Sequence, residues 1–350
     1  MAELQTYQTD ELIRFSAHAL QSVGVPAEDA ELTARSLVEA DKRGINSHGL
    51  LRLPLYVDAI EQRGINAHPN MRWVTDTGSA ALLDADGALG QVSMTGAVEY
   101  AKTHTQERGV SVVAVQNSSH YGAGAFWSDQ LAAEGFVAIL TSTTGPTVAP
   151  FGGVAKVFGT NPLTIAAPSA GPHPLTADMA TSTGAYGKVI AAKNEGTAIP
   201  EGWAVDSAGV PTTDPLEAMA GALIPFGGHK GSAVSALLEA VAASLGTGRY
   251  AYETEDIWSN PGSRMNTGHL LIAIDTGAFT GREYTEERVS TLQARIRSSG
   301  AEGYTVYAPG DPEYARGEQN RQSVTLTAST AQLLDQLAVR LDIAPVPPAA

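Results

Sequence analysis

Residues 41–56 read Asp41-Lys-Arg-Gly-Ile-Asn-Ser47-His48-Gly49-Leu-Leu-Arg52-Leu-Pro-Leu-Tyr56, so an imidazole, a hydroxyl, a guanidinium and a phenol share one short segment. A hydrophobic core has little use for these groups so close together. A site that donates a proton and holds a carboxylate needs them. The alternative is an ordinary helix start, with Ser47 as the N-cap and His48 and Arg52 solvated. The segment alone leaves both interpretations open.

Composition narrows the class of protein. The chain has 350 residues, of which 43% are hydrophobic and 17% are charged, and its 36 glycines fit a globular α/β enzyme. The formal net charge of −15 argues against nucleic acid or an anionic membrane as a partner, so an anionic substrate would need a local pocket of Lys or Arg. The absence of cysteine excludes disulfides, thiolate catalysis and Cys-ligated metals, and it suits a cytoplasmic protein. Because no apolar run is long enough to cross a membrane and no secretory leader is recognisable, we expect a soluble, unprocessed chain.

Hydrophobic periodicity predicts three helices at the N-terminus. The first follows Thr9, its expected N-cap, the second runs from Pro26 towards Gly44, and the third has its apolar face between residues 50 and 60. At spacings of three to four, His48, Arg52 and Tyr56 would lie on one side of the third helix.

From about residue 71, short apolar runs alternate with glycine and proline clusters, which predicts buried strands joined by loops. The expected strands are 80–83, 110–115, 136–140, 163–167 and 270–274. The expected helices are 91–105, 214–222, 232–245, 285–297 and 331–341. We expect the proline-rich tail at 345–348 to fray.

His120 belongs to a second polar segment, which follows an apolar run and contains Gly122 and Gly124. This segment resembles the opening of a dinucleotide fingerprint, but Trp127 stands where the third glycine belongs, so a Rossmann fold is not predicted. The alternative for His120 is a loop histidine that bonds only to backbone carbonyls.

Two more segments suit an anionic or hydroxylated ligand. Gly227-Gly228-His229-Lys230-Gly231 precedes a long helix and could hold an anion at the helix N-terminus, the alternative being a tight turn with an exposed lysine. Asp178 follows an apolar run and could bond a ribose hydroxyl or orient a histidine, the alternative being a plain N-cap. The histidines His18, His104 and His173 are expected at the surface. No histidine pair has metal-ligand spacing, so no metal is predicted.

Seven polar segments occur along the chain in a recognisable order: Ser47-His48-Gly49 with Arg52 and Tyr56, Asn117-Ser-Ser-His120-Tyr-Gly122, Phe158-Gly-Thr-Asn161-Pro162, Asp178-Met179-Ala180-Thr-Ser182, Gly202-Trp-Ala, Gly227-Gly-His229-Lys230-Gly and Pro309-Gly310-Asp311. Together they resemble the type 2 malate/L-lactate dehydrogenase family over nearly the whole chain. That family also contains ureidoglycolate, sulfolactate and diketogulonate oxidoreductases, and reductases of the cyclic ketimines piperideine- and pyrroline-2-carboxylate.

The resemblance implies an NAD(P)-dependent homodimer with a non-Rossmann α/β fold, in which a mixed sheet has flanking helices and both termini form a helical domain. The implied division is a helical domain (1–65 plus 312–350), a substrate- and dimer-side α/β domain (66–122 plus 286–311) and an NAD(P)-binding α/β domain (123–285). The cofactor would lie in a cleft between domains.

The resemblance also assigns roles to residues. His48 is the main candidate for proton donor or acceptor, with Ser47 tuning or relaying the proton, and His120 is the second candidate. Arg52 and Tyr56 match substrate-binding positions, and Arg52 is expected to hold the substrate carboxylate. The cofactor-contacting positions are His120, Gly122, Thr144, Asn161, Asp178, Met179, Ala180, His229, Lys230, Gly310, Asp311 and Pro312.

Two clues to the substrate disagree. Residues 227–233 look like the ketimine reductases, whereas Gly187-Lys188 follows the hydroxy-acid enzymes, because the ketimine reductases tend to carry an aspartate, a proposed proton relay, in place of Lys188. We therefore expect a small 2-hydroxy acid and its 2-oxo acid, with ketimine reduction as the alternative and NAD and NADP both open.

A hydrolase triad of Ser47, His48 and Asp178 is less favoured than either oxidoreductase. Sequence neighbours on a helix do not face each other, and no Gly-x-Ser-x-Gly segment is present.

Overall fold

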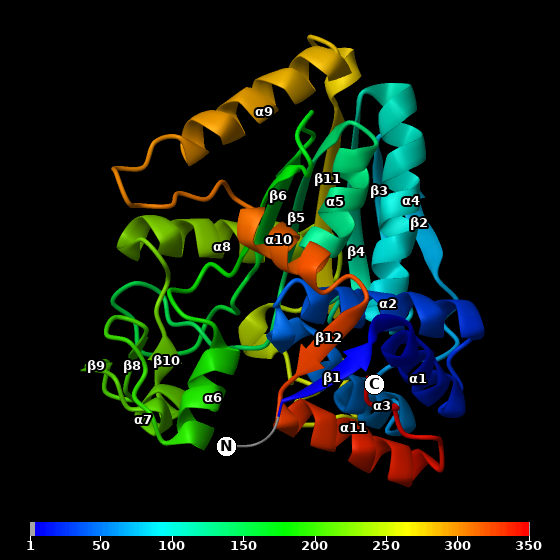
Figure 1. The fold of residues 1–350 in the computed structure, drawn as a ribbon, viewed down its shortest axis with the longest axis vertical. Helices are drawn as coiled ribbons and strands as arrows, with labels where there is room; N and C mark the ends of the chain where they lie inside the picture. The colour runs from blue at the N-terminus through cyan, green and yellow to red at the C-terminus, as the bar shows by residue number, and fades with distance from the viewer. Residues whose placement is uncertain (1–3, 350) are drawn as a thin grey trace.

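The computed structural model describes residues 4–349, and its centre is a seven-stranded mixed sheet (Figure 1). The strand order is β2-β3-β4-β11-β5-β6-β7, and β3–β4 is the one parallel pair while the other neighbours are antiparallel. The strands are β2 (Arg72–Asp76), β3 (Ala80–Asp84), β4 (Val110–Ser118), β11 (Thr267–Asp275), β5 (Phe136–Ser142), β6 (Leu163–Ala167) and β7 (Leu175–Met179). Doubly wound dinucleotide folds have a mostly parallel sheet, so this order confirms the non-Rossmann prediction.

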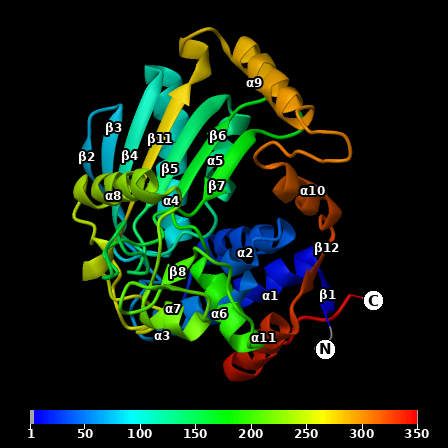
Figure 2. The same ribbon diagram turned by 90° about the vertical axis from the view of Figure 1, so that its left-hand side faces the viewer.

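Helices cover both faces of this sheet. α4 (Gly90–Arg108) and α5 (Ala125–Ala133) pack on one face, and α8 (Gly228–Ser244) lies on the other, in front of the sheet in Figure 2. The central strands β4, β11 and β5 are buried between these layers, which explains why they read as nearly continuous apolar runs. α9 (Arg282–Arg297) and α10 (Asp311–Gln319) follow β11 and return the chain towards its N-terminal region.

Both ends of the chain form one helical unit. β1 (Gln5–Gln8) pairs antiparallel with β12 (Ser323–Leu326), and α11 (Ala328–Leu341) packs against α1 (Thr9–Ser22) and α3 (Leu53–Glu61). α2 (Ala27–Lys42) packs against α1 and reaches towards the sheet. The helical domain built from both termini is therefore confirmed.

A smaller lobe lies beside the sheet and has its own apolar core, which includes Val189, Ile199 and Leu223. It contains α6 (Tyr186–Glu195), α7 (Pro215–Ala220) and a three-stranded sheet in the order β10-β8-β9, made of β8 (Ala204–Val205), β9 (Pro211–Thr212) and β10 (Ala222–Leu223). The remaining short 3-10 turns are η1 (Asn46–His48), η2 (Leu50–Arg52), η3 (Ala251–Glu253) and η4 (Thr276–Ala278).

Two local predictions are wrong. Thr9 is the first residue of α1 rather than its cap, because Gln8 takes the cap position with extended backbone. The tail does not fray: Val346 is buried, Pro348 bridges to Tyr7, and the Ala349 N–H donates to the Thr6 carbonyl at 2.8 Å. The tail adds to the β1–β12 ribbon, a partner that local sequence does not reveal.

Candidate active site

The segment 41–56 folds into two 3-10 turns, η1 and η2, followed by α3 with Pro54 in its first turn. The turns are separated by Gly49, whose extended backbone stops a continuous helix. The buried Asp41 carboxylate accepts the Leu50 N–H at 2.7 Å and lies where a side chain at position 49 would have to be, so this turn needs glycine. Burial raises the pKa of Asp41 to about 7. The sequence predicted that His48, Arg52 and Tyr56 lie on one side of a single helix. The structure has two 3-10 turns there instead, and Asp41 at the end of α2 fixes them.

Within the first turn, Ser47 and His48 contact each other through Oγ and Nδ1 at 2.9 Å, and Arg52 Nε donates to the Ser47 carbonyl at 2.6 Å. The prediction that these neighbours do not meet is wrong, because it assumed a regular α-helix. Asp178 does not complete a triad with them: its carboxylate accepts from the Thr164 hydroxyl at 2.7 Å and from the Ala125 N–H at 2.9 Å.

His120 joins this group from the loop after β4. Its Nδ1 lies 2.7 Å from the Tyr56 hydroxyl, which also accepts from Gln91 Nε2 at 3.2 Å. The His48 and His120 rings stack with centroids 5.3 Å apart. The structure thus brings together the two histidines, Tyr56 and Arg52 as one cluster.

Trp258 is a member of this cluster that the sequence did not indicate. Arg52 Cζ lies 4.4 Å from the centre of its ring, and the His120 ring meets it edge-on at 5.6 Å. The neighbouring Asp256 accepts the Trp258 N–H at 3.0 Å. An isolated tryptophan in a loop has no periodicity, so only the tertiary contacts assign it to the site.

Burial and charge keep both histidines neutral. Burial, and then the Arg52 cation, lower the pKa of His48 to about 4. Burial followed by the nearby His48, Arg52 and His269 holds the pKa of His120 well below its usual range. Burial raises the pKa of Tyr56 to about 12, so the phenol keeps its proton. Arg52 is therefore the charged residue of the cluster, and the hydrogen-bonding groups around it are neutral.

Arg52 forms no ion pair with any carboxylate of residues 4–349, and Asp256 acts on it only from beyond ion-pair distance. Burial raises the pKa of Asp256 to about 6, which Arg52 partly offsets. A half-buried guanidinium without a carboxylate is an unusual arrangement, because the desolvated charge has nothing of opposite sign beside it.

The residues predicted on the cofactor side occupy several elements around β7. Asp178 and the exposed Met179 are the last residues of β7, and Ala180 follows them. Gly122 has φ 83°, next to Gln91. Thr144 Oγ1 accepts the Thr160 N–H at 2.9 Å. Asn161 is fully buried and donates to Glu239 at 2.6 Å, so here it shapes its loop rather than lining an open surface.

Two glycine turns complete that side. His229 and Lys230 are exposed in the first turn of α8, after Gly227 and Gly228, which both have φ 62°. Gly310 has φ 92° and packs against β7 at the Thr176 carbonyl, just before Asp311 and Pro312 begin α10.

Asp311 is bound to protein side chains. It pairs with Arg297 at 2.7 Å and with His173 at 2.9 Å, and these contacts, Arg297 first, lower its pKa to about 2. The prediction that His173 is a surface residue is wrong, because this carboxylate and the Tyr314 ring cover its imidazole.

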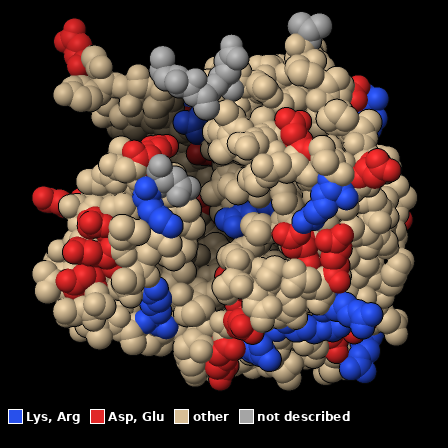
Figure 3. Space-filling view, turned by 90° about the horizontal axis from the view of Figure 1, so that it is seen from below, with Lys and Arg blue, Asp and Glu red and all other residues tan. Residues whose placement is uncertain are grey.

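The chemistry of these groups fits a dinucleotide. The exposed Lys230 ammonium and His229 imidazole at the start of α8 suit a pyrophosphate, and the exposed Asp178 carboxylate near the end of β7 suits a ribose hydroxyl. Seen from below, the molecule is hollowed between two lobes, with Lys or Arg side chains visible in the hollow (Figure 3). No set of three or more His, Asp or Glu side chains within residues 4–349 is arranged to hold a metal. In the same part of the chain no helix has both the length and the apolarity to cross a bilayer.

Comparison with known proteins points to one family. A family model described as malate/L-lactate dehydrogenase matches residues 7–335. The L-sulfolactate dehydrogenase of Methanocaldococcus jannaschii is 38% identical over 84% of this chain and 85% of its own. The (2R)-3-sulfolactate dehydrogenase (NADP(+)) of Chromohalobacter salexigens is 35% identical over 92% and 94%. The solved structure of Δ1-piperideine-2-carboxylate reductase from Pseudomonas syringae pvar. tomato superposes with a TM-score of 0.87 at 29% identity, covering 95% of this chain and 100% of that one. The chain therefore belongs to the malate/L-lactate dehydrogenase family of oxidoreductases.

Proposed function

We propose that the protein interconverts a small 2-hydroxy acid and its 2-oxo acid, with NAD or NADP as the hydride carrier. The observation that supports this most directly is Arg52, a half-buried guanidinium with no ion-pair partner in residues 4–349, next to two stacked neutral imidazoles. A substrate carboxylate would supply the missing negative charge and place the rest of the molecule against the histidines.

The contacts of the Arg52 guanidinium orient it to bind a carboxylate. Its Nε is held by the Ser47 carbonyl and its plane is supported by Trp258, while its terminal Nη groups make no hydrogen bond to the described residues. A planar fork held in this way matches a carboxylate in a bidentate fashion. Tyr56 and Trp258 would restrict the space beside it.

Either histidine can supply the proton once its ring has become an imidazolium. The Tyr56 phenol accepts from Gln91, and we propose that it donates its own proton to His120 Nδ1, in the tautomer that carries its hydrogen at Nε2. His48 is oriented in turn by Ser47 Oγ. We propose His48 as the main donor and His120 as the second candidate. Substrate reduction needs a proton on the carbonyl oxygen, and the bound dinucleotide supplies the hydride to the carbonyl carbon.

Substrate binding would also tune these histidines. Arg52 lowers the pKa of both imidazoles. When a carboxylate neutralises Arg52, the pKa values of both rings should rise, so a proton becomes available only when the substrate is in place.

The proposed dinucleotide site consists of Gly122, Thr144, Asn161, Asp178, Met179, Ala180, His229, Lys230, Gly310, Asp311 and Pro312, together with His120. Asp178 would accept a ribose hydroxyl, and the start of α8 would hold the phosphates. Asn161 and Asp311 would act by shaping their loops, since both side chains are engaged with the protein.

Ketimine reduction is the second candidate, supported by residues 227–233 and by the similarity to the piperideine-2-carboxylate reductase structure. Lys188 weighs against it. Gly187 packs against Ser47, with 3.6 Å between the Ser47 Cβ and the place of a Cβ at 187, so Lys188 lies next to the candidate site. A cation there suits an anionic oxo acid better than it suits a protonated imine.

The test is a panel of reactions followed at the nicotinamide absorbance. NADH and NADPH are each mixed with pyruvate, oxaloacetate, sulfopyruvate or piperideine-2-carboxylate. We expect oxidation with at least one oxo acid and slower or no oxidation with the imine. Preference for the imine would support the second candidate, and no oxidation with any of the four would refute both. The resemblance also implies a homodimer, and light scattering tests this prediction through the mass of the protein in solution.

A further inference from the structure

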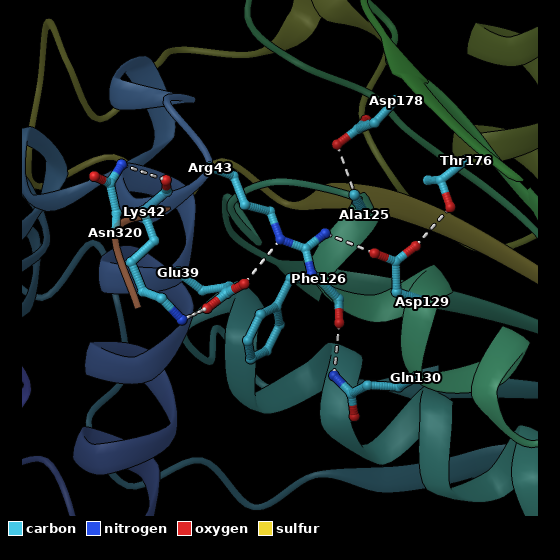
Figure 4. A network of polar contacts seen from close by, with 10 residues as sticks. All are labelled: Glu39, Lys42, Arg43, Ala125, Phe126, Asp129, Gln130, Thr176, Asp178 and Asn320. Carbon is cyan, nitrogen blue, oxygen red and sulfur yellow. Dashed lines mark hydrogen bonds and ion pairs between the residues drawn. The ribbon is translucent and has the colours of Figure 1, made fainter. Parts of the chain in front are cut away.

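Arg43 connects the two halves of the candidate site. It is the C-cap of α2, five residues before His48, and it lies at the centre of the polar network in Figure 4. Its Nη1 forms an ion pair with Asp129 on α5 at 2.6 Å, and its Nε bonds Glu39 on α2 at 2.8 Å. Glu39 also pairs with Lys42, so the Arg43 side chain is directed by its own helix.

The two carboxylate oxygens of Asp129 bind two different parts of the chain, the end of α2 and strand β7. Its Oδ2 accepts from Arg43, and its Oδ1 accepts from the buried Thr176 hydroxyl on β7 at 2.7 Å. Thr176 and Asp178 are two residues apart on β7 and therefore point to the same face of the sheet. A single carboxylate thus links the helix that leads into Ser47, His48 and Arg52 to the strand that carries Asp178 near its end.

α5 makes this link rigid. The first N–H of α5, at Ala125, donates to Asp178 at 2.9 Å, and Asp129 lies one helical turn further along. Both bonds hold α5 to β7, as Figure 4 shows. Around them, Asn320, the C-cap residue of α10, donates to the Lys42 carbonyl at 2.9 Å, which fixes the end of α2 from another side.

We propose that Arg43 and Asp129 are positioning residues that set the distance between the substrate half-site at 47–56 and the cofactor half-site at the end of β7. Neither residue touches the reacting groups. Their effect would be on the alignment of hydride donor and acceptor, for which displacements on the order of 1 Å can lower the rate by about a hundredfold. The activity tests of this proposal rest on the proposed function.

The variants are Arg43→Met, Arg43→Lys and Thr176→Val, with Arg35→Met as the matched control. Arg35 lies on the same helix in an exposed pair with Glu31 and makes no contact with α5 or β7 among the contacts of the described residues. Thr176→Val removes only the hydroxyl that reaches Asp129, so it tests the same link from the other side without leaving a charge unpaired.

We expect Arg43→Met and Thr176→Val to lower kcat by about tenfold to a hundredfold. The primary isotope effect with reduced cofactor deuterated at the transferred position should rise, while the NADPH dissociation constant from fluorescence titration changes little. Arg43→Lys should restore part of kcat, and Arg35→Met should match the unaltered protein. Because both changes break one link, the double variant should be no slower than the slower single variant.

Amide hydrogen exchange separates this proposal from the assignment of the reaction. In the protein without cofactor, residues 44–52 should exchange faster in Arg43→Met and Thr176→Val than in Arg35→Met. Unchanged exchange, or variants that lose only thermal stability while kcat and the isotope effect stay constant, would overturn the positioning role. If the unaltered protein oxidises neither cofactor with any oxo acid, the proposed function fails and the exchange measurement still decides the coupling.

Discussion

Replacing Arg52 with methionine is expected to lower kcat/KM for the 2-oxo acid by about 10²- to 10³-fold. The guanidinium is held at Nε by the Ser47 carbonyl and lies over Trp258, and its two Nη groups remain for the ligand. Two charge-assisted hydrogen bonds to a carboxylate contribute about 1.5–3 kcal/mol each. Two such bonds sum to about 3–6 kcal/mol. The expected loss lies in the lower part of that range, about 3–4 kcal/mol, because Arg52 is only half-buried, and about 1.4 kcal/mol is one factor of ten.

The same variant should change the pH profile. Arg52 is the second cause, after burial, of the low pKa of His48, which is about 4. Without the cation, the pKa of His48 rises towards its ordinary value, so the alkaline limb of kcat/KM for oxo-acid reduction, where His48 loses the proton it has to donate, moves to higher pH. Arg52→Lys should keep most of this electrostatic effect but lose the bidentate geometry, with a kcat/KM between the other two.

The assay is steady-state oxidation of NADH or NADPH by the best oxo acid of the panel, between pH 5 and 9, with the cofactor saturating. Arg72→Met is the control, because Arg72 is an exposed arginine on edge strand β2 that pairs with Asp84. An Arg52→Met protein that keeps its KM for the oxo acid and its pH profile would refute the carboxylate role.

Three further outcomes follow from the same contacts. Tyr56→Phe should lower kcat about tenfold, since it removes a hydrogen bond of about 1.5 kcal/mol that orients His120. The NADPH dissociation constant measured by fluorescence should stay constant. An unchanged kcat would argue against the tautomer in which His120 Nδ1 accepts the Tyr56 proton. The Asp256 carboxyl has a pKa of about 6, so above that pH it is charged and competes with the substrate carboxylate for Arg52. The KM for the oxo acid should therefore rise about fivefold from pH 5.5 to 7.5, and it should not change with pH in Asp256→Asn. Equal pH dependence of KM in both proteins would exclude this competition. The Asp311 pKa of about 2 lies below the unfolded value of 3.8, so its stabilisation is present above pH 4 and lost as pH falls through 2. Asp311→Asn should therefore cost about 1–2 kcal/mol in urea unfolding at pH 7 and nothing near pH 2, after allowing for the partly exposed Arg297; an equal cost at both pH values would contradict the ion-pair origin.

Periodic and ordered features were predicted well from the sequence. The strands around 110–115, 136–140 and 270–274 appear as β4, β5 and β11, because a buried central strand has to be a continuous apolar run. The non-Rossmann fold and the helical domain from both termini were implied by the family resemblance that the ordered polar segments carry. Strands β1, β2 and β12 were not predicted, since they are short or largely exposed and acquire their identity only from their partners.

The candidate site was also predicted only in part. Ser47, His48, Arg52, Tyr56 and His120 could be named because so many reactive groups in short segments have no role in a core. The 3-10 turns at 46–52 could not be predicted, since Asp41 imposes them from α2. Trp258, Gln91 and Asp256 were missed because none of them stands in a patterned segment.

By itself, the sequence determined which side chains are available for chemistry, where the chain is apolar enough to form a sheet, and to which family it belongs. The tertiary structure alone decided that His48 and His120 stack, that Arg52 forms no ion pair within residues 4–349, and that Arg43 pairs with Asp129. The physical reason is that pKa values, unpaired charges and bridging contacts depend on distances between residues far apart in the chain. Local sequence sets the residues and their secondary structure, whereas packing sets those distances.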